Sequence, residues 1–165
     1  MTGLDDFAAR FRSDIRAELD WERLAEMRAG VRVETLGQRA GRRRLAELFT
    51  VWYAGPEGDD SSWSAPGSRP LRVAAADRTL PSWPVERRRA VTALTRAFAE
   101  GPEPLPLTLP AYRVDEDRCV LLDGNHRAVA AHRTGADIHL TLWSLSGPVC
   151  ESILPDLRHY AAPLT

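Results

Sequence analysis

The chain has 165 residues, of which 44% are hydrophobic and 27% charged, and its formal net charge at pH 7 is −1. This length and composition suit one soluble domain, or a small domain with an added arm, whose core needs no disulfide or metal for support. A net charge close to zero gives no overall attraction to nucleic acid or to an anionic membrane. The basic residues other than histidine are all arginine, which is consistent with a GC-rich bacterial genome.

The two cysteines, Cys119 and Cys150, form neither a CxxC pair nor a cluster with zinc-ligand spacing. Residues 1–6 lack the apolar core of a signal peptide, and no segment approaches the length of a membrane span. We therefore expect a cytoplasmic protein with no membrane partner.

The first half of the chain has a mixed pattern. Apolar residues recur every three or four positions over residues 4–29, which predicts a helix. Residues 31–36 alternate like a strand, and residues 37–44 read as a polar turn. Residues 45–53 could be a second hairpin strand or a buried helix, and the aromatic and β-branched residues at their end favour the strand.

Residues 54–70 are rich in glycine, proline and serine, which predicts a loop and a domain boundary. We expect an N-terminal arm over residues 1–70, with a helix and a possible β-hairpin, and a compact domain over residues 71–165. The arm is also the expected surface for a homodimer, if one forms.

The second half predicts an α+β domain with a small mixed sheet flanked by helices. The expected elements are strand 71–75, a helix from Pro84 to Gly101, strand 105–112, strand 119–122, helix 125–134, strand 138–145, and a terminal helix 148–160 bent at Pro155. Pro106 and Pro110 cannot donate ladder hydrogen bonds, so strand 105–112 is expected at a sheet edge.

The sequence Asp123-Gly124-Asn125-His126-Arg127 follows a buried strand and begins a helix of small residues. Gly124 permits a sharp turn, and the free amides at a helix N-terminus favour an anion. Arg127 can bind phosphate oxygens bidentately, and His126 can hold a phosphate or move a proton near pH 7. We predict a phosphate-binding turn at these five residues, rather than a helix cap with unrelated neighbours.

Three carboxylates are candidates for proton transfer or Mg²⁺ binding beside the phosphate-binding turn. Asp123 can orient His126, accept a proton or bind Mg²⁺. Asp77 follows strand 71–75 and could face the same end of the sheet, although it also fits a turn or cap residue. Glu86 could be a second catalytic acid, but the first turn of a helix is itself a common place for glutamate.

Three further residues are candidates for a substrate pocket. Trp83 and Trp143 could stack on a base or shape the pocket, although core packing is the commoner role of tryptophan. Ser144, near the end of the last strand, is a candidate contact for a small substrate.

The order of elements over residues 71–145 resembles that of the ParB/sulfiredoxin-like superfamily, and residues 122–131 are similar to its LDGHHR motif. The resemblance implies a nucleotide-binding turn. The sulfiredoxin branch has a cysteine immediately before the His-Arg pair, where this chain has Asn125, so thiol-based sulfinic-acid repair is not expected. The chromosome-partitioning branch has a helix-turn-helix further on, for which a chain ending at Thr165 leaves no length.

The free-serine kinase branch carries DGHHR, which differs from this chain only at Asn125. It also uses a glutamate between its first strand and first helix as catalytic base. The matching stretch here, residues 76–86, offers Asp77 and Glu86.

We therefore expect an enzyme that binds ATP, ADP or another nucleotide with Mg²⁺ and transfers a phosphoryl group to a small hydroxyl compound. The alternatives are a ParB-like phosphodiesterase or nuclease, a non-catalytic nucleotide-dependent switch, or a biosynthetic enzyme with a changed reaction. Nucleic acid is otherwise not an expected partner. A pocket lined by Asp77 and Trp143 would favour catalysis, whereas a pocket closed by the N-terminal segment would favour the switch.

Overall fold

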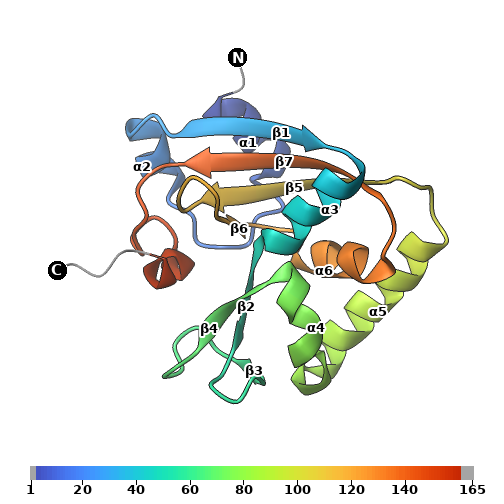
Figure 1. Ribbon diagram of the computed structural model, residues 1–165. Helices are drawn as coiled ribbons and strands as arrows, with labels where there is room; N and C mark the ends of the chain where they lie inside the picture. The colour runs from blue at the N-terminus through green and yellow to red at the C-terminus, as the bar shows by residue number, and fades with distance from the viewer. Residues whose placement is uncertain (1–2, 161–165) are drawn as a thin grey trace.

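A seven-stranded mixed sheet organises residues 3–160, which are the residues that this computed structural model describes (Figure 1). The strand order is β1-β7-β5-β6-β2-β3, and β4 pairs with β2. The strands are β1 (Gly30–Leu36), β2 (Phe49–Ala54), β3 (Asp60–Ser61), β4 (Arg69–Arg72), β5 (Leu105–Arg113), β6 (Cys119–Leu121) and β7 (Ile138–Ser146). Helices flank this sheet, which confirms the predicted α+β class with a mixed sheet between helices.

The helices differ greatly in length. They are α1 (Leu4–Phe11), α2 (Trp21–Glu26), α3 (Gln38–Glu47), α4 (Ala76–Thr79), α5 (Val85–Ala99) and α6 (Asn125–Thr134), with 3-10 helices η1 (Val73–Ala75), η2 (Leu80–Ser82) and η3 (Pro155–His159). Within the described residues, no helix combines the length and apolar character needed to cross a membrane.

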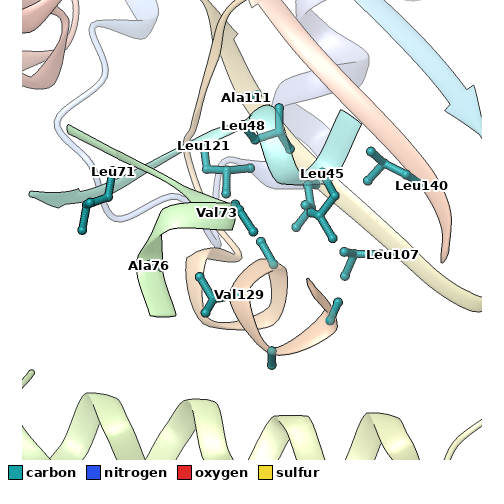
Figure 2. Packing of buried hydrophobic residues seen from close by; sticks show 14 of the residues in the cluster. Leu45, Leu48, Leu71, Val73, Ala76, Leu107, Ala111, Leu121, Val129 and Leu140 are labelled. Atoms are coloured by element: carbon teal, nitrogen blue, oxygen red, sulfur yellow. The ribbon is translucent and has the colours of Figure 1, made fainter. Parts of the chain in front are cut away.

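One face of the sheet carries the larger core cluster, part of which is drawn in Figure 2. Leu107 and Leu140 project from β5 and β7 toward Leu45 of α3 and Val129 of α6. The remaining residues on the buried side of α6 include three alanines, so this helix can pack close to the sheet. Helix α5 lies outside α6 and contacts it along its length (Figure 1).

The other face is covered by the two ends of the chain. Because side chains alternate along a strand, Tyr112, Val120 and Leu145 point away from the larger cluster and into a second one. There they meet Phe7 of α1 and Leu157 of η3. The two covering segments are joined where the Asp20 amide donates to the Ile153 carbonyl at 2.9 Å.

The helix predicted over residues 4–29 is wrong in its middle, because α1 ends at Phe11 and α2 begins only at Trp21. Ile15 and Leu19 remain buried in the connection, so the apolar spacing reflects burial of an irregular segment. Asp20 starts the second helix, since its side chain accepts the Arg23 amide at 3.0 Å.

The polar turn predicted over residues 37–44 is also wrong, because these residues begin helix α3. Only Gly41 and Leu45 of this helix are buried, which is too few apolar positions to show a helical period. The strand expected at the end of residues 45–53 is confirmed as β2, whereas the first three residues of that range belong to α3. The strand predicted over residues 31–36 is confirmed.

The strand at residues 105–112 is confirmed, but its predicted edge position is wrong. β5 lies between β7 and β6 and runs parallel to β7 over its whole length. β6 pairs with it only over Ala111–Arg113. Pro106 and Pro110 therefore fall in the stretch that has a strand ladder on one side only, where a missing amide donor is tolerated.

Of the predictions for the remaining elements, four are confirmed and two are wrong in part or whole. The predictions for the helix from Pro84 to Gly101, the strand at 119–122, the helix at 125–134 and the strand at 138–145 are confirmed. Of the strand predicted at 71–75, the last three residues form η1, and the helix predicted at 148–160 is reduced to η3. The loop at 54–70 contains β3 and the start of β4, and strands from both sides of residue 70 join the same sheet.

The close contact between α3 and β7 gives a test of the fold. A Cβ atom at Gly41 would lie 2.5 Å from the Ile138 carbonyl oxygen and 2.7 Å from that of Leu36. Although alanine usually favours a helix over glycine, we expect Gly41→Ala to lower the free energy of unfolding by about 1–3 kcal/mol through overpacking, measured by urea unfolding. The control is Gly30→Ala, whose Cβ would meet its nearest atom at 3.8 Å. Equal or greater stability of Gly41→Ala would contradict this packing.

Candidate functional site

A cleft of about 880 Å³ opens beside the N-terminus of α6. Its walls come from four parts of the chain: the connection between α1 and α2, strand β2, the turn before α6, and η3. The lining residues are Ser13, Asp14, Arg16, Ala17, Val51, Trp52, Leu122, Asp123, Gly124, Asn125, His126, Arg127 and Asp156. The whole predicted turn thus lies in one cleft, of a volume typical of small-molecule sites.

The turn depends on Gly124, which has a left-handed backbone with φ of 78°. A Cβ here would lie 2.5 Å from Leu109 Cδ2 and 2.9 Å from Arg127 Nη2, so both conformation and space require glycine. The first hydrogen bond within α6 runs from the Ala128 amide to the Gly124 carbonyl at 2.8 Å. The amides of residues 125–127 precede it and belong to the helix end that attracts anions.

Asn125 fixes this helix end against the sheet. Its side chain is only 9% exposed, and Oδ1 accepts a hydrogen bond from the Val51 amide at 3.0 Å. The sequence suggested Asn125 as a phosphate ligand, and its backbone amide is placed for that role. Its side-chain oxygen, however, is occupied by the hydrogen bond from the Val51 amide of β2.

Arg127 lies over the turn. Its Nη2 is 3.4 Å from Asp123 Oδ2, with the two side chains 42% and 33% exposed. An ion pair this exposed contributes little to stability. Arg127 can therefore exchange Asp123 for phosphate oxygens at small cost.

His126 stands at the mouth of the cleft with its ring edge-on to Trp52, the ring centroids being 5.1 Å apart. The residue as a whole is exposed, but partial burial of the ring lowers its pKa, and the Arg87 guanidinium lowers it further. Asp123 acts in the opposite direction. Near pH 7 the imidazole is therefore neutral, so it offers one donor and one acceptor.

A second arginine contacts the tryptophan that packs against His126. Arg87 on α5 lies over the rings of Trp52 and Trp83, with its Cζ 5.1 Å from each centroid. Its Nη1 also bonds Asp60 at 2.7 Å. This stack fixes Trp52, which forms a wall of the cleft.

The two other predicted carboxylates lie away from the cleft. Asp77 pairs with Arg133 at 2.7 Å, in the last turn of α6 and thus at the opposite end of that helix from the turn. Glu86 is exposed in the first turn of α5. Neither lines the cleft with His126.

The predicted substrate-pocket residues are in the two cores. Trp83 is 2% exposed, and its Nε1 donates to Thr79 Oγ1 at 2.8 Å. Trp143 packs against Phe11 at 5.6 Å between ring centroids, on the face with the second cluster. Ser144 is fully buried in β7. None of the three lines the cleft.

Asp14, Arg16 and Asp156 line the cleft but carry no signal in the sequence. Asp14 and Arg16 lie in a segment that the sequence assigned to the middle of a helix. Asp156 is in η3, where its Oδ1 accepts the Tyr53 hydroxyl at 3.1 Å. Burial raises the pKa of Asp156, while the hydrogen bond from Tyr53 and the nearby His159 lower it. All three approach the turn only because the chain ends cover this side of the sheet.

Residues 3–160 contain no group of three or more His, Cys, Asp and Glu side chains that could by itself hold a metal ion. The cleft does contain three carboxylates, on Asp14, Asp123 and Asp156. One or two carboxylates together with phosphate oxygens are the usual surroundings of Mg²⁺. These residues therefore fit an ion that enters with a phosphate ligand.

Comparison of the chain with protein-family models, with curated proteins and with solved structures found no match. Function is therefore inferred from the geometry of this cleft.

Asn125 has a side-chain hydrogen bond to β2 and a backbone amide at the start of α6, and this combination gives a test of the site. Replacing Asn125 with alanine leaves the Val51 amide without its acceptor, and we expect unfolding free energy to fall by about 1–3 kcal/mol. Asn125→Asp keeps an acceptor oxygen, so its stability should stay near that of the native protein. Its added charge beside the helix amides should weaken pyrophosphate binding by about tenfold or more. Urea unfolding and calorimetric titration measure the two effects, and native stability of Asn125→Ala would refute the structural role.

Proposed function

We propose that the cleft binds the phosphates of a nucleotide and that the protein transfers a phosphoryl group to a small hydroxyl compound. The observation that carries this proposal is the arrangement at the end of β6. Residues 123–127 present helix amides, Arg127 and a neutral His126 to a single cleft. A relation to the ParB/sulfiredoxin-like superfamily would account for the same turn and is part of the proposal.

The division of labour follows from the contacts. The amides of residues 125–127 and the Arg127 guanidinium hold phosphate oxygens, which they reach from a helix end and from above the turn. His126 donates a further hydrogen bond, directed by its packing against Trp52. Cleft carboxylates such as Asp123 would hold Mg²⁺, which would supply neutralisation of the charge on the phosphates.

Phosphoryl transfer requires little covalent chemistry from the protein, because positioning and electrostatic stabilisation account for most of the rate. The cleft offers both, since the turn provides the helix amides and Arg127, and its carboxylates come from three separate parts of the chain. Asp77, which the sequence offered as a catalytic partner, is replaced in this account by carboxylates that line the cleft.

A nucleotide-dependent switch is the second candidate function, and one observation favours it. Ser13, Asp14, Arg16 and Ala17 form a wall of the cleft, and they belong to the connection between α1 and α2. A ligand on the turn would touch this connection. Binding could then change how the N-terminal segment packs and what it presents to a partner.

The direct test is titration of the protein with ATP and ADP, with and without Mg²⁺, followed by calorimetry. We expect Arg127→Ala to weaken binding about 10- to 100-fold, since a charge-assisted bond contributes about 1.5–3 kcal/mol. The control is Arg133→Ala, which removes an arginine from the other end of α6 and should leave affinity unchanged.

His126→Ala separates the two candidate functions. A loss of ADP formation at saturating nucleotide, beyond the fall in nucleotide affinity, supports the enzyme, whereas a native protein that binds ATP without forming ADP supports the switch. Absence of binding by the native protein under every condition would overturn both.

A further inference from the structure

Asp156 occupies an unusual place among the carboxylates of this chain. It lies in η3, in the C-terminal segment, yet it lines the same cleft as the turn before α6. The hydroxyl of Tyr53, on β2, donates to its Oδ1 at 3.1 Å. Over residues 3–160, this is the side-chain hydrogen bond that Asp156 makes, and Oδ2 makes none there.

The surroundings of Asp156 are partly apolar and partly charged. The Tyr53 ring lies 4.8 Å from that of His159, and Tyr160 is buried beside them. The titratable groups that face Asp156 from its own segment and from β2 are Tyr53, His159 and Tyr160, and Arg158 acts on Tyr53. Those that share the cleft are Asp14, Arg16, Asp123, His126 and Arg127.

We propose that Asp156 is the proton acceptor for the hydroxyl substrate of this cleft, and that Tyr53 positions its carboxylate. This proposal rests on the phosphoryl transfer proposed above and names the group that activates the acceptor. Asp156 lines the same cleft as the phosphate-binding turn but comes from a separate segment, so it can contact a ligand of the cleft without taking part in the turn.

The other carboxylates suit this role less well. Asp123 is paired with Arg127 on the phosphate side of the cleft. Asp14 is exposed on the connection between α1 and α2, and no side-chain hydrogen bond within residues 3–160 positions its carboxylate. Asp156 is more enclosed, and a carboxylate whose pKa is raised by burial is the stronger base once ionised.

The hydroxyl oxygen of the acceptor forms a bond to the terminal phosphorus of ATP, and its proton passes to the Asp156 carboxylate. The bond between that phosphorus and the bridging oxygen breaks, and the electron pair leaves with ADP. The products are a phosphate monoester, ADP and a protonated Asp156, which returns its proton to solvent.

Asp156→Asn is the main test. Asparagine keeps an oxygen for the Tyr53 hydrogen bond but cannot take up the proton. The full-length protein is assayed for ADP formation from MgATP with water, glycerol or free serine as acceptor. We expect turnover to fall about 100-fold or more, with ADP affinity within about twofold of the native value. The control is Glu151→Gln, an exposed acid of the same segment that does not line the cleft and should not affect turnover.

Tyr53→Phe provides a second test that a merely structural role would not pass. Turnover needs ionised Asp156, so it should rise as pH rises through the pKa of this group. The hydrogen bond from Tyr53 lowers that pKa, so its loss should raise the pKa and move the acidic limb of the pH profile to higher pH. This variant carries the test if Asp156→Asn fails to fold, as judged by circular dichroism.

The outcomes separate the two proposals. Native turnover in a folded Asp156→Asn variant, or an unmoved acidic limb in Tyr53→Phe, overturns the role of Asp156 and leaves the proposed phosphoryl transfer intact. Native protein that binds ATP without forming ADP overturns the phosphoryl transfer, and the role of Asp156 with it, and leaves only phosphate binding. Failure of the native protein to bind ATP or ADP overturns the proposed function itself.

Discussion

The hydrogen bond from the Val51 amide to Asn125 Oδ1 joins two segments that are 74 residues apart in the sequence. It holds the first residue of α6 against β2, while Gly124 in its left-handed conformation sets the direction in which the helix leaves the sheet. Trp52, the neighbour of Val51, meets His126, the neighbour of Asn125. One partly buried hydrogen bond thus positions the amides, the imidazole and one wall of the cleft together.

Charge in the cleft is balanced, not simply positive. The helix amides, Arg16 and Arg127 attract an anion, whereas Asp14, Asp123 and Asp156 oppose one. Three carboxylates would weaken a site whose only task was to bind an anion. They are consistent with a site where one carboxylate accompanies Mg²⁺ and another handles a proton, because both tasks belong to phosphoryl transfer. The lowered pKa of His126 fits the same balance, since a neutral ring adds a donor without further charge.

The sequence predicted the turn because all its determinants are adjacent: a buried strand, a glycine and a small-residue helix from Asn125. It failed where burial departs from regular structure, as over residues 12–20, whose apolar spacing continues through an irregular segment. It also missed Asp156, because nothing local connects this residue with His126. Only the packing of both chain ends on one sheet face brings it to the cleft. The sequence wrongly placed Asp77 beside the turn. In the fold it pairs with Arg133, which lies at the far end of α6.

The central claim is that a phosphate ligand binds at the N-terminus of α6. The most direct measurement is a two-dimensional ¹H–¹⁵N NMR titration with pyrophosphate and then MgADP. The account predicts that the largest shifts occur at the amides of residues 124–127 and at the Arg127 side chain, with smaller shifts at Val51 and residues 13–17. Shifts confined to the arginines of α5 or β4, with unchanged signals at residues 124–127, would contradict it.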